Sequence, residues 1–379
     1  MAEADQRGAA GPTQSGIQTF EASHVAAVAE LFQSTFRRPR DPAPDALRNY
    51  LEDIFLNHRL SDPDICSLVF VDAGGKVAGF IGVLPARLTF RGEPLRAAVA
   101  GSLMVDNPAE NPLAGARLLR SFLSGPQDLS ISESANALSA GMWERLGHKP
   151  VAAYSLDWVR VLRPVGFGVA ALASGFRPAK MLSPLAMAVD AGLGRIARNP
   201  FRLESGRRGG GLAADVGDDE LVAHIPEFIE QFAVRPDWDD DRLRWILKHA
   251  DRKKRYGRTF KRLVYGKGGK PLGCYIYYGR PRGIAWVLQI LARPDSAAAV
   301  LDDLLRHAHD LGSVAVRGRA HPSLMNALTR ENAFFFSRSS TVVCSRNADL
   351  TGAINSGDAL VTGLAAEAWI RLIGDEFDQ

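Results

Sequence analysis

The sequence predicts a mixed α/β protein with two domains, each a mostly antiparallel sheet flanked by helices. Three observations lead to this prediction. Helical and strand patterns alternate along 379 residues, a length that is long for one compact domain and comfortable for two. A stretch rich in Gly, Ala, Arg and Pro at 163–211 separates two patterned blocks. The order of elements in the first block then recurs in the second.

The composition is that of an ordinary globular protein, with 46% hydrophobic and 23% charged residues. The net charge of +4 is too small to predict nucleic-acid binding. Cys66, Cys274 and Cys344 are far apart and form no CxxC motif, so we expect reduced cysteines and a cytoplasmic protein. Residues 1–16 lack an apolar segment and are expected to be disordered, and the apolar run 165–176 is too short to span a membrane.

The first domain is predicted over residues 17–162. Its patterns indicate two helices, two strands joined by a Gly-Gly turn, a third strand, and then helix, strand, helix and strand. These segments are 24–37, 44–58, 67–73, 76–90, 96–105, 113–123, 128–134, 135–146 and 151–162. Because 96–105 is almost continuously apolar, we expect it to be a central strand.

The second domain is predicted over residues 212–379, after a partly helical linker at 163–211. It has the same turn, strand, helix, strand and helix order as the first block, in the segments 268–275, 284–292, 297–311, 314–318 and 322–335. Recurrence of one supersecondary unit indicates a repeated architecture.

The passage 99–148 is the most informative for function. The sequence NPLAGA at 111–116 follows the apolar strand and opens a helix. Small side chains allow a phosphate to approach the main chain, and a helix start attracts negative charge. Pro112 removes one amide donor, and Asp106 and Glu110 add negative charge. The alternatives are therefore a site for a phosphorylated cofactor and a polar loop before a Pro-started helix.

These residues resemble the GNAT (Gcn5-related N-acetyltransferase) superfamily, and the two blocks look like a tandem-GNAT protein. In that family the central strand ends in Gln/Arg-x-x-Gly-x-Gly/Ala, whose amides bind the pyrophosphate of acyl-CoA. The segment 111–116 is similar to this motif, with Asn111 in place of the cation. A later family motif, an Asn and a helix ending in aromatic-x-x-Leu-Gly-aromatic, resembles 136–148, which ends in WERLGH.

The resemblance implies acyl-CoA, most simply acetyl-CoA, as co-substrate and no metal. The strand end would pair with the pantetheine amides through its backbone. The residues implied in cofactor binding are Met104, Val105, Asn111, Ala114, Gly115, Ala116 and Asn136. Asparagine is also an ordinary helix cap, so for Asn136 a purely structural role is the alternative.

Two residues are candidates for proton transfer. Glu133, near the end of strand 128–134, is the candidate general base, because an amine must lose a proton to attack a thioester. Tyr154, expected on strand 151–162, is the candidate general acid. Trp143 occupies the position where many GNAT enzymes have a tyrosine, and an indole N–H does not supply a proton in that way. The alternatives are a solvated glutamate and a tyrosine that only packs on the sheet.

The second block offers a different surface. Its loop 293–296 has no glycine, so we expect no phosphate site there and a structural or acceptor-binding role for this domain. The basic run at 252–262 is the candidate docking patch for a carrier protein, and a solvated loop balanced by the acidic residues 237–241 is the alternative. His307 and His309 are two residues apart on a helix and cannot share a metal.

The predicted function is transfer of an acyl group, most simply acetyl, from acyl-CoA to an amine of a small molecule or amino sugar by direct attack. Two alternatives stay open. One is a non-catalytic, degenerate GNAT pair that acts as a binding or scaffold module. The other is an acyltransferase whose donor is acyl carrier protein.

Overall fold

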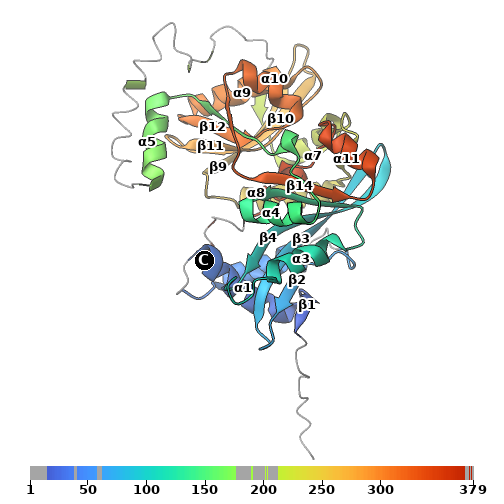
Figure 1. Cartoon of the computed structure of the whole chain (residues 1–379). Coiled ribbons are helices and arrows are strands. Elements are labelled where there is room, and N and C mark those ends of the chain that lie inside the picture. The colour runs from blue at the N-terminus through green and yellow to red at the C-terminus, as the bar shows by residue number, and fades with distance from the viewer. Residues whose placement is uncertain are drawn as a thin grey trace, which may run out of the picture. The chain divides into compact units, whose positions relative to one another are not determined.

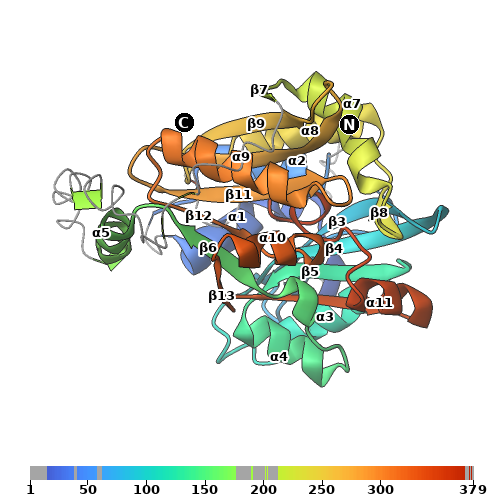
Figure 2. The same cartoon turned by 90° about the horizontal axis from the view of Figure 1, so that it is seen from above.

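The computed structural model describes residues 15–37, 41–57, 62–175, 189–190, 201, 203, 212–371, 375 and 377. The chain forms two compact units. Unit 1 comprises residues 1–85, 100–126 and 377–379, and unit 2 comprises residues 86–99 and 127–376. Helices flank two sheets of mixed strand direction (Figures 1 and 2). The predicted mixed α/β fold class is confirmed.

Unit 1 contains the N-terminal helices and strands. Its elements are β1 (Gly16–Thr19), the 3-10 helix η1 (Ala22–His24), α1 (Val25–Phe36), α2 (Asp45–Phe55), β2 (Leu68–Val71), the first part of β3 (Val77–Phe90), the last part of β4 (Glu93–Val105) and α3 (Ala114–Leu123). The turn at Gly74 joins β2 to β3 in the predicted hairpin. Strand β1 begins at Gly16, inside the segment that was expected to be disordered, and pairs with β2.

Helices cover both faces of β3 in unit 1. A Cβ atom added to Gly79 would lie 2.9 Å from Leu118 of α3, and one added to Gly82 would lie 2.5 Å from the ring of Phe55 of α2. Positions 79 and 82 point to opposite faces of the strand, so α3 and α2 pack on opposite sides. The two glycines permit a close approach that any larger residue would prevent.

Unit 2 contains the remaining parts of β3 and β4 and all later elements. These are β5 (Leu129–Ala135), α4 (Ala137–Arg145), η2 (Ala152–Tyr154), β6 (Asp157–Val161), α5 (Pro164–Gly175), β7 (Ala213–Asp215), α7 (Asp218–Ile229), β8 (Val234–Pro236), α8 (Asp240–Asp251), β9 (Arg258–Tyr265), β10 (Pro271–Gly279), β11 (Ile284–Ala292), α9 (Ala297–Asp310), β12 (Ala315–Arg319), η4 (Pro322–Leu324), α10 (Met325–Arg330), β13 (Phe334–Phe336), β14 (Ser340–Ser345), α11 (Ala348–Asn355) and η5 (Gly363–Ala365). Most of the predicted linker 163–211 lies outside the described residues.

The strand order of the first sheet confirms that the segment 96–105, which was expected to be a central strand, is one. The first sheet has the order β1-β2-β3-β4-β5-β14, with β8 paired to β3, and the second has the order β13-β6-β12-β11-β10-β9-β7. Strand β4 is flanked on both sides, as its apolar sequence predicted. In each sheet one strand pair is parallel, β4 with β5 and β11 with β12, and the pairs β1–β2, β2–β3, β3–β8, β5–β14, β6–β12, β6–β13, β7–β9, β9–β10 and β10–β11 are antiparallel.

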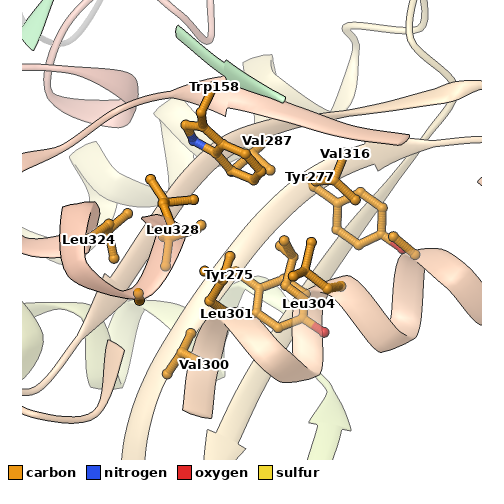
Figure 3. Close-up of a cluster of buried hydrophobic side chains, with 14 of the residues drawn as sticks. Trp158, Tyr275, Tyr277, Val287, Val300, Leu301, Leu304, Val316, Leu324 and Leu328 are labelled. Carbon is orange, nitrogen blue, oxygen red and sulfur yellow. The ribbon is translucent and has the colours of Figure 1, made fainter. Parts of the chain in front are cut away.

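The core of the second sheet lies under α9 and α10 (Figure 3). Tyr275 and Tyr277 are two residues apart on β10 and both point to this face, as does Trp158 of β6. The helix α9 contributes a stripe at helical spacing, Val300, Leu301, Leu304, Leu305 and Ala308. On the opposite face the hydroxyl of Tyr278 donates to the carbonyl of Ala250 in α8, 3.0 Å away. The sheet is therefore covered by helices on both faces.

Two strands are exchanged between the halves of the sequence. Strand β6 follows α4 of the first half but pairs with β12 of the second sheet, with Val161 opposite Ala315. Strand β14 comes late in the chain but pairs with β5 of the first sheet, with Val343 opposite Ile131. The predicted domains 17–162 and 212–379 are therefore not the two compact units. Periodicity identifies a strand, but it does not identify the strand's partner.

Both parallel ladders are short. The ladder between β4 and β5 joins Ala97–Val99 to Leu129–Ile131, although β5 continues to Ala135. The ladder between β11 and β12 joins Ile284–Trp286 to Ala315–Arg317, although β11 continues to Ala292. In each pair, one strand therefore continues past the ladder, and its backbone groups there are not paired with the parallel neighbour.

Candidate functional site

The proposed phosphate loop lies in unit 1, between β4 and α3. Met104 is buried at the end of β4, and Val105 is the last residue of the strand. In the loop the side-chain amide of Asn111 donates to the carbonyl of Asp106 over 3.2 Å, and the N–H of Ala114 donates to the carbonyl of Asn111 over 3.2 Å. Asn111 therefore fixes the shape of the loop through its own hydrogen bonds.

The start of α3 has the features of an anion-binding site. The N-cap position is Leu113, whose side chain provides no capping hydrogen bond. The first amides of a helix have no acceptor within it. Here the N–H of Ala114 donates to Asn111, so the amides available to an anion are those of the small residues Gly115 and Ala116. Ala114 and Gly115 are buried and Ala116 is exposed. Ala116 is thus the part of the expected site that solvent reaches.

Two cations near the loop were missed by the sequence reasoning. Lys76, in the turn before β3, forms an ion pair with Asp106, and this contact raises the pKa of the lysine. Arg117, in the first turn of α3, places its guanidinium 5.1 Å from the centre of the Phe70 ring. The acidic character expected of this loop is therefore reduced by Lys76, a neighbour that is distant in sequence.

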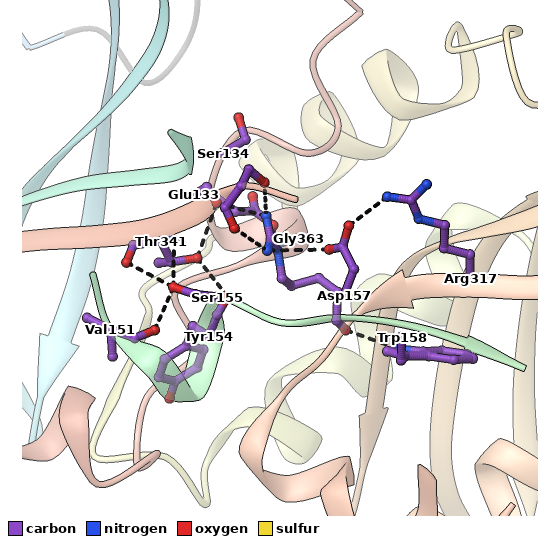
Figure 4. A network of polar contacts seen from close by, with 12 residues as sticks. Glu133, Ser134, Val151, Tyr154, Ser155, Asp157, Trp158, Arg317, Thr341 and Gly363 are labelled. Atoms are coloured by element: carbon purple, nitrogen blue, oxygen red, sulfur yellow. Dashed lines mark hydrogen bonds and ion pairs between the residues drawn. The ribbon is translucent and has the colours of Figure 1, made fainter. Parts of the chain in front are cut away.

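Glu133 lies in unit 2 and is bound on both of its carboxylate oxygens. Oε1 accepts from the N–H of Gly363 at 3.0 Å (Figure 4). Oε2 accepts from the N–H groups of Glu367 and Ala368, both at 3.2 Å. Its side chain is buried, and burial raises its pKa, while Arg319 and the three N–H groups oppose that shift. The alternative of a solvated glutamate is thus excluded, and the residue holds the chain around η5.

A second glutamate, Glu367, lies beside the first and was not considered from sequence. Its Oε1 accepts from the N–H of Ser134 at 2.9 Å and from the Ser134 hydroxyl. Burial, and then the charge of Glu133, raise the pKa of Glu367 to about 8. Its sequence context, a single charge in the apolar run GLAAEAWI at 363–370, is the signal that could have indicated it.

Further charged groups complete this cluster within unit 2. The ammonium of Lys253 donates to the carbonyls of Ala368 and Ile370, at 2.6 and 3.0 Å, and burial lowers its pKa to about 8. Asp375 accepts from the N–H of Arg255 at 2.9 Å, and burial raises its pKa. The C-terminal segment after η5 is therefore held by side chains from β5 and from the end of α8.

Tyr154 and Asn136 also lie in unit 2, in positions that favour structural roles. Tyr154 belongs to the 3-10 helix η2 and not to the predicted strand 151–162, because β6 begins at Asp157. Its hydroxyl donates to the carbonyl of Ala359 at 2.7 Å, it is fully buried, and burial raises its pKa. Asn136 is the N-cap of α4 and accepts from the N–H of Ser139 at 2.9 Å.

One threonine connects two of the predicted residues. The hydroxyl of Thr341 in β14 lies 3.1 Å from the carbonyl oxygen of Glu133 and 2.8 Å from that of Tyr154 (Figure 4). The predicted site residues thus fall into two groups. The loop residues are in unit 1, whereas Glu133, Asn136 and Tyr154 are in unit 2.

In the second half of the chain, η5 packs against β11. The N–H of Leu364 in η5 donates to Oε1 of Gln289 in β11 at 3.0 Å, and a Cβ on Gly363 would lie 2.8 Å from the carbonyl oxygen of Leu288. This contact lies on β11 just past its ladder with β12. In the loop before α9, Arg293 donates to the carbonyl of Pro271 at 2.7 Å.

The basic run 252–262 is divided between two environments. Lys253 is engaged as described, and Lys261 donates to Asp218 and Asp251 at 2.5 and 2.6 Å. A pocket of about 700 Å³ adjoins the run and is lined by Asp215, Val216, Gly217, Asp218, Asp251, Lys254, Gly257, Arg258, Thr259, Phe260 and Lys261. Its lining has three acidic and three basic side chains, and two of the basic ones, Lys254 and Arg258, are exposed and available to a docking patch.

The described residues contain no group of three or more His, Cys, Asp or Glu side chains that could hold a metal ion. None of the helices in the described part of the chain is long and apolar enough to cross a membrane.

No family model and no curated protein matches this sequence. Solved structures do match its fold. A conserved protein of unknown function from Enterococcus faecalis V583, described as a probable N-acyltransferase, matches over 88% of this chain and 72% of its own, with a TM-score of 0.57 and 10% identity. The chain has the GNAT fold.

Two further structures with the GNAT fold support this assignment. GCN5-related N-acetyltransferases from Kribbella flavida and Anabaena variabilis ATCC 29413 match with TM-scores of 0.52 and 0.55 and identities of 12% and 14%. They cover 87% and 88% of this chain, and the matches span 70% and 73% of the two structures. The resemblance inferred from residues 111–116 and 136–148 is thereby confirmed at the level of the fold.

Proposed function

We propose that the protein is an acyltransferase that moves an acyl group, most simply acetyl, from acyl-CoA to an amine of a small molecule or amino sugar. The observation that carries this proposal is the start of α3, where small residues and helix amides without internal acceptors follow the end of β4. The Lys76–Asp106 ion pair adds support, because it removes negative charge that would oppose a pyrophosphate.

In this proposal each part of the site has a defined task. The amides of Gly115 and Ala116 would bind the pyrophosphate, with Arg117 one residue further along the helix. The backbone at Met104 and Val105 would bind pantetheine and polarise the thioester carbonyl. Asn111 would support the loop, and Asn136 would cap α4. No covalent enzyme intermediate is needed, because the amine attacks the thioester directly.

A non-catalytic binding module is the second candidate. Pro112 in the loop and the buried Trp143 in place of a tyrosine favour it, since both remove groups that the reaction would use. Acyl carrier protein as donor is the third candidate, and it depends on the exposed cations Lys254 and Arg258.

Calorimetric titration with acetyl-CoA and with a longer acyl-CoA tests the proposal. Ala116→Glu places a carboxylate at the exposed helix start and is expected to weaken binding at least tenfold through charge repulsion. Gly115→Glu has the same purpose, but Gly115 is buried, so its folding must be checked. Ala298→Glu in the first turn of α9 is the matched control and should leave affinity unchanged. Failure of both thioesters to bind would refute the proposal.

The donor is tested separately. Lys254→Glu reverses an exposed charge of the basic run. Lys253 is unsuitable for this test, because its ammonium group donates to a backbone carbonyl of the C-terminal segment. Unchanged turnover with acyl carrier protein in Lys254→Glu and in Arg258→Glu would contradict the docking patch.

A further inference from the structure

One edge of the second sheet, within unit 2, is only partly paired. Strand β7 is the last strand of this sheet, and β9 lies beside it (Figure 2). Strand β7 pairs only with residues 262–264 of β9, whereas β10 pairs with β9 from Arg258 onward. Residues 258–261 therefore have a strand of the described chain on one side only.

The free side of this segment presents main-chain groups for pairing. The bond that continues the β7 ladder runs from the N–H of Val216 to the carbonyl of Lys261, at 3.0 Å. In an antiparallel sheet, residues two apart direct their N–H and C=O groups to the same side. Thr259 therefore directs its groups to the side of β7, beyond the point where that strand ends. Unpaired main-chain groups on a sheet edge are a template for a further strand.

A pocket follows this edge. Its volume is about 700 Å³, and five consecutive residues of its lining, 257–261, belong to the edge and to the turn before it. The segment 215–218, from the end of β7 to the start of α7, and two residues near the end of α8 line it as well. Four residues of a strand are about 13 Å long, and ligand pockets have volumes of about 300–1,000 Å³. The pocket therefore has room for a short extended peptide.

The pocket also has two cations that are not used in ion pairs. Residues of β9 bind its three carboxylates; the pairs are Lys261 with Asp218 and Asp251, at 2.5 and 2.6 Å, and Arg262 with Asp215, at 2.8 Å. Lys254 and Arg258 are exposed, and neither forms an ion pair within the described part of the chain. The guanidinium of Arg258 lies 5.1 Å from the centre of the Phe260 ring. Both free charges are therefore available to an anionic ligand.

These two cations decide which kind of chain fits the edge. A second copy of this protein, paired edge to edge, would bring Lys254 and Arg258 close to the same two cations, and like charges disfavour such pairing. An acidic chain would instead place carboxylates beside them, in charge-assisted hydrogen bonds. The sheet edge requires an extended backbone, and the cations require negative side chains.

We propose that residues 257–261 bind an acidic, extended peptide segment of a partner protein. The peptide pairs with the free edge of β9 at Thr259 and places carboxylates beside Lys254 and Arg258. In this mode of binding, main-chain hydrogen bonds provide affinity and side-chain contacts provide specificity. The inference concerns unit 2 alone and does not depend on the proposed acyl transfer.

Fluorescence anisotropy with the whole chain and a fluorescein-labelled pentaglutamate amide tests the charge requirement. Lys254→Glu and Arg258→Glu should each raise the Kd about tenfold, because each replaces an attraction with a repulsion. Lys267→Glu, in the exposed turn at the other end of β9, is the matched control and should leave the Kd unchanged. Labelled pentalysine should not bind.

The requirement for strand pairing is tested at Thr259. Because its N–H points away from β10, Thr259→Pro breaks no bond of the sheet and removes the donor that the peptide needs. Thr259→Pro should abolish binding, whereas Thr259→Val keeps the N–H and should bind as the wild type does. A pentaglutamate with every amide N-methylated keeps its carboxylates but donates no main-chain hydrogen bond. It should bind the wild type about tenfold more weakly.

The outcomes separate the alternatives. Failure of pentaglutamate to bind overturns the proposal. Equal affinity for the plain and N-methylated probes overturns it too, because the site would then hold anions without strand pairing. Urea denaturation shows whether Thr259→Pro folds, and the N-methylated probe decides if it does not. Acetyl-CoA titration of Lys254→Glu should match the wild type, so this proposal and the proposed acyl transfer can fail separately.

Discussion

The pH dependence of stability gives the sharpest test of the buried acid pair. Glu367→Gln is the appropriate perturbation because it removes the ionisation and preserves an oxygen for the hydrogen bonds from Ser134. The wild-type side chain keeps its proton in the folded state up to a pKa of about 8, since burial and Glu133 disfavour its charged form. In the unfolded chain it loses the proton near the ordinary pKa of about 4.3.

The sign and size of this pH dependence follow from the linkage between proton binding and folding. Between these two pKa values the folded state binds one proton more than the unfolded state, so stability falls as pH rises. The loss of stability is absent at pH values below the pKa of Glu367 in the unfolded chain, and it is complete above pH 8. One proton corresponds to about 1.4 kcal/mol per pH unit, so between pH 5.5 and 7.5 the wild type should lose about 3 kcal/mol relative to Glu367→Gln.

Urea denaturation of both proteins across this pH range measures the difference. Titrating groups that do not interact with Glu367, such as His321 with its pKa lowered to about 4, contribute equally to both proteins and cancel. Glu144→Gln serves as the control, because its carboxylate is exposed. A stability difference between Glu367→Gln and wild type that stays constant from pH 5.5 to 7.5 would refute the reasoning.

Three further predictions concern the fold and are checked by urea denaturation at one pH. Glu133→Leu leaves three backbone N–H groups without their acceptor and should cost about 3–5 kcal/mol, whereas Glu144→Leu should cost less than about 0.5. Gly363→Ala should cost about 2–4 kcal/mol, because φ is +70° and the Cβ would meet β11 at 2.3 Å; Gly92→Ala, with φ of +91° and open space, should cost about 1. Leu118→Ala empties a buried site against β3 and should cost about 2–5 kcal/mol, and a smaller loss would mean that α3 does not pack there as described.

The elements of the chain could be predicted closely from local patterns. The helix expected at 24–37 is Val25–Phe36, and the strand expected at 96–105 is Glu93–Val105. Hydrophobic periodicity reports which residues are buried and therefore which element they form. The prediction of one strand at 151–162 was wrong in part, because the 3-10 helix Ala152–Tyr154 precedes the short strand Asp157–Val161. Strand β1 was missed because four residues carry little periodic signal.

The site was predictable only where its parts are contiguous in sequence. The loop at 111–116 was identified because its small residues stand together. Lys76 and Glu367 were not, because Lys76 meets Asp106 across 30 residues and Glu367 meets Ser134 across 233. Such contacts depend on tertiary structure, and a single sequence does not contain them. Glu133 was identified by its place near a strand end, but the three N–H groups that occupy it come from the other end of the chain.

The exchange of β6 and β14 means that neither half of the sequence is complete without the other. A fragment ending before residue 212 would carry β6 with no β12 to pair with and would expose the edge of β5, and a fragment starting there would carry β14 with no β5. Unpaired edges promote aggregation. Two fragments made together would instead complete each other's sheets and should remain one particle. The same pairing makes folding depend on contacts between distant parts of the chain, which form late and slowly.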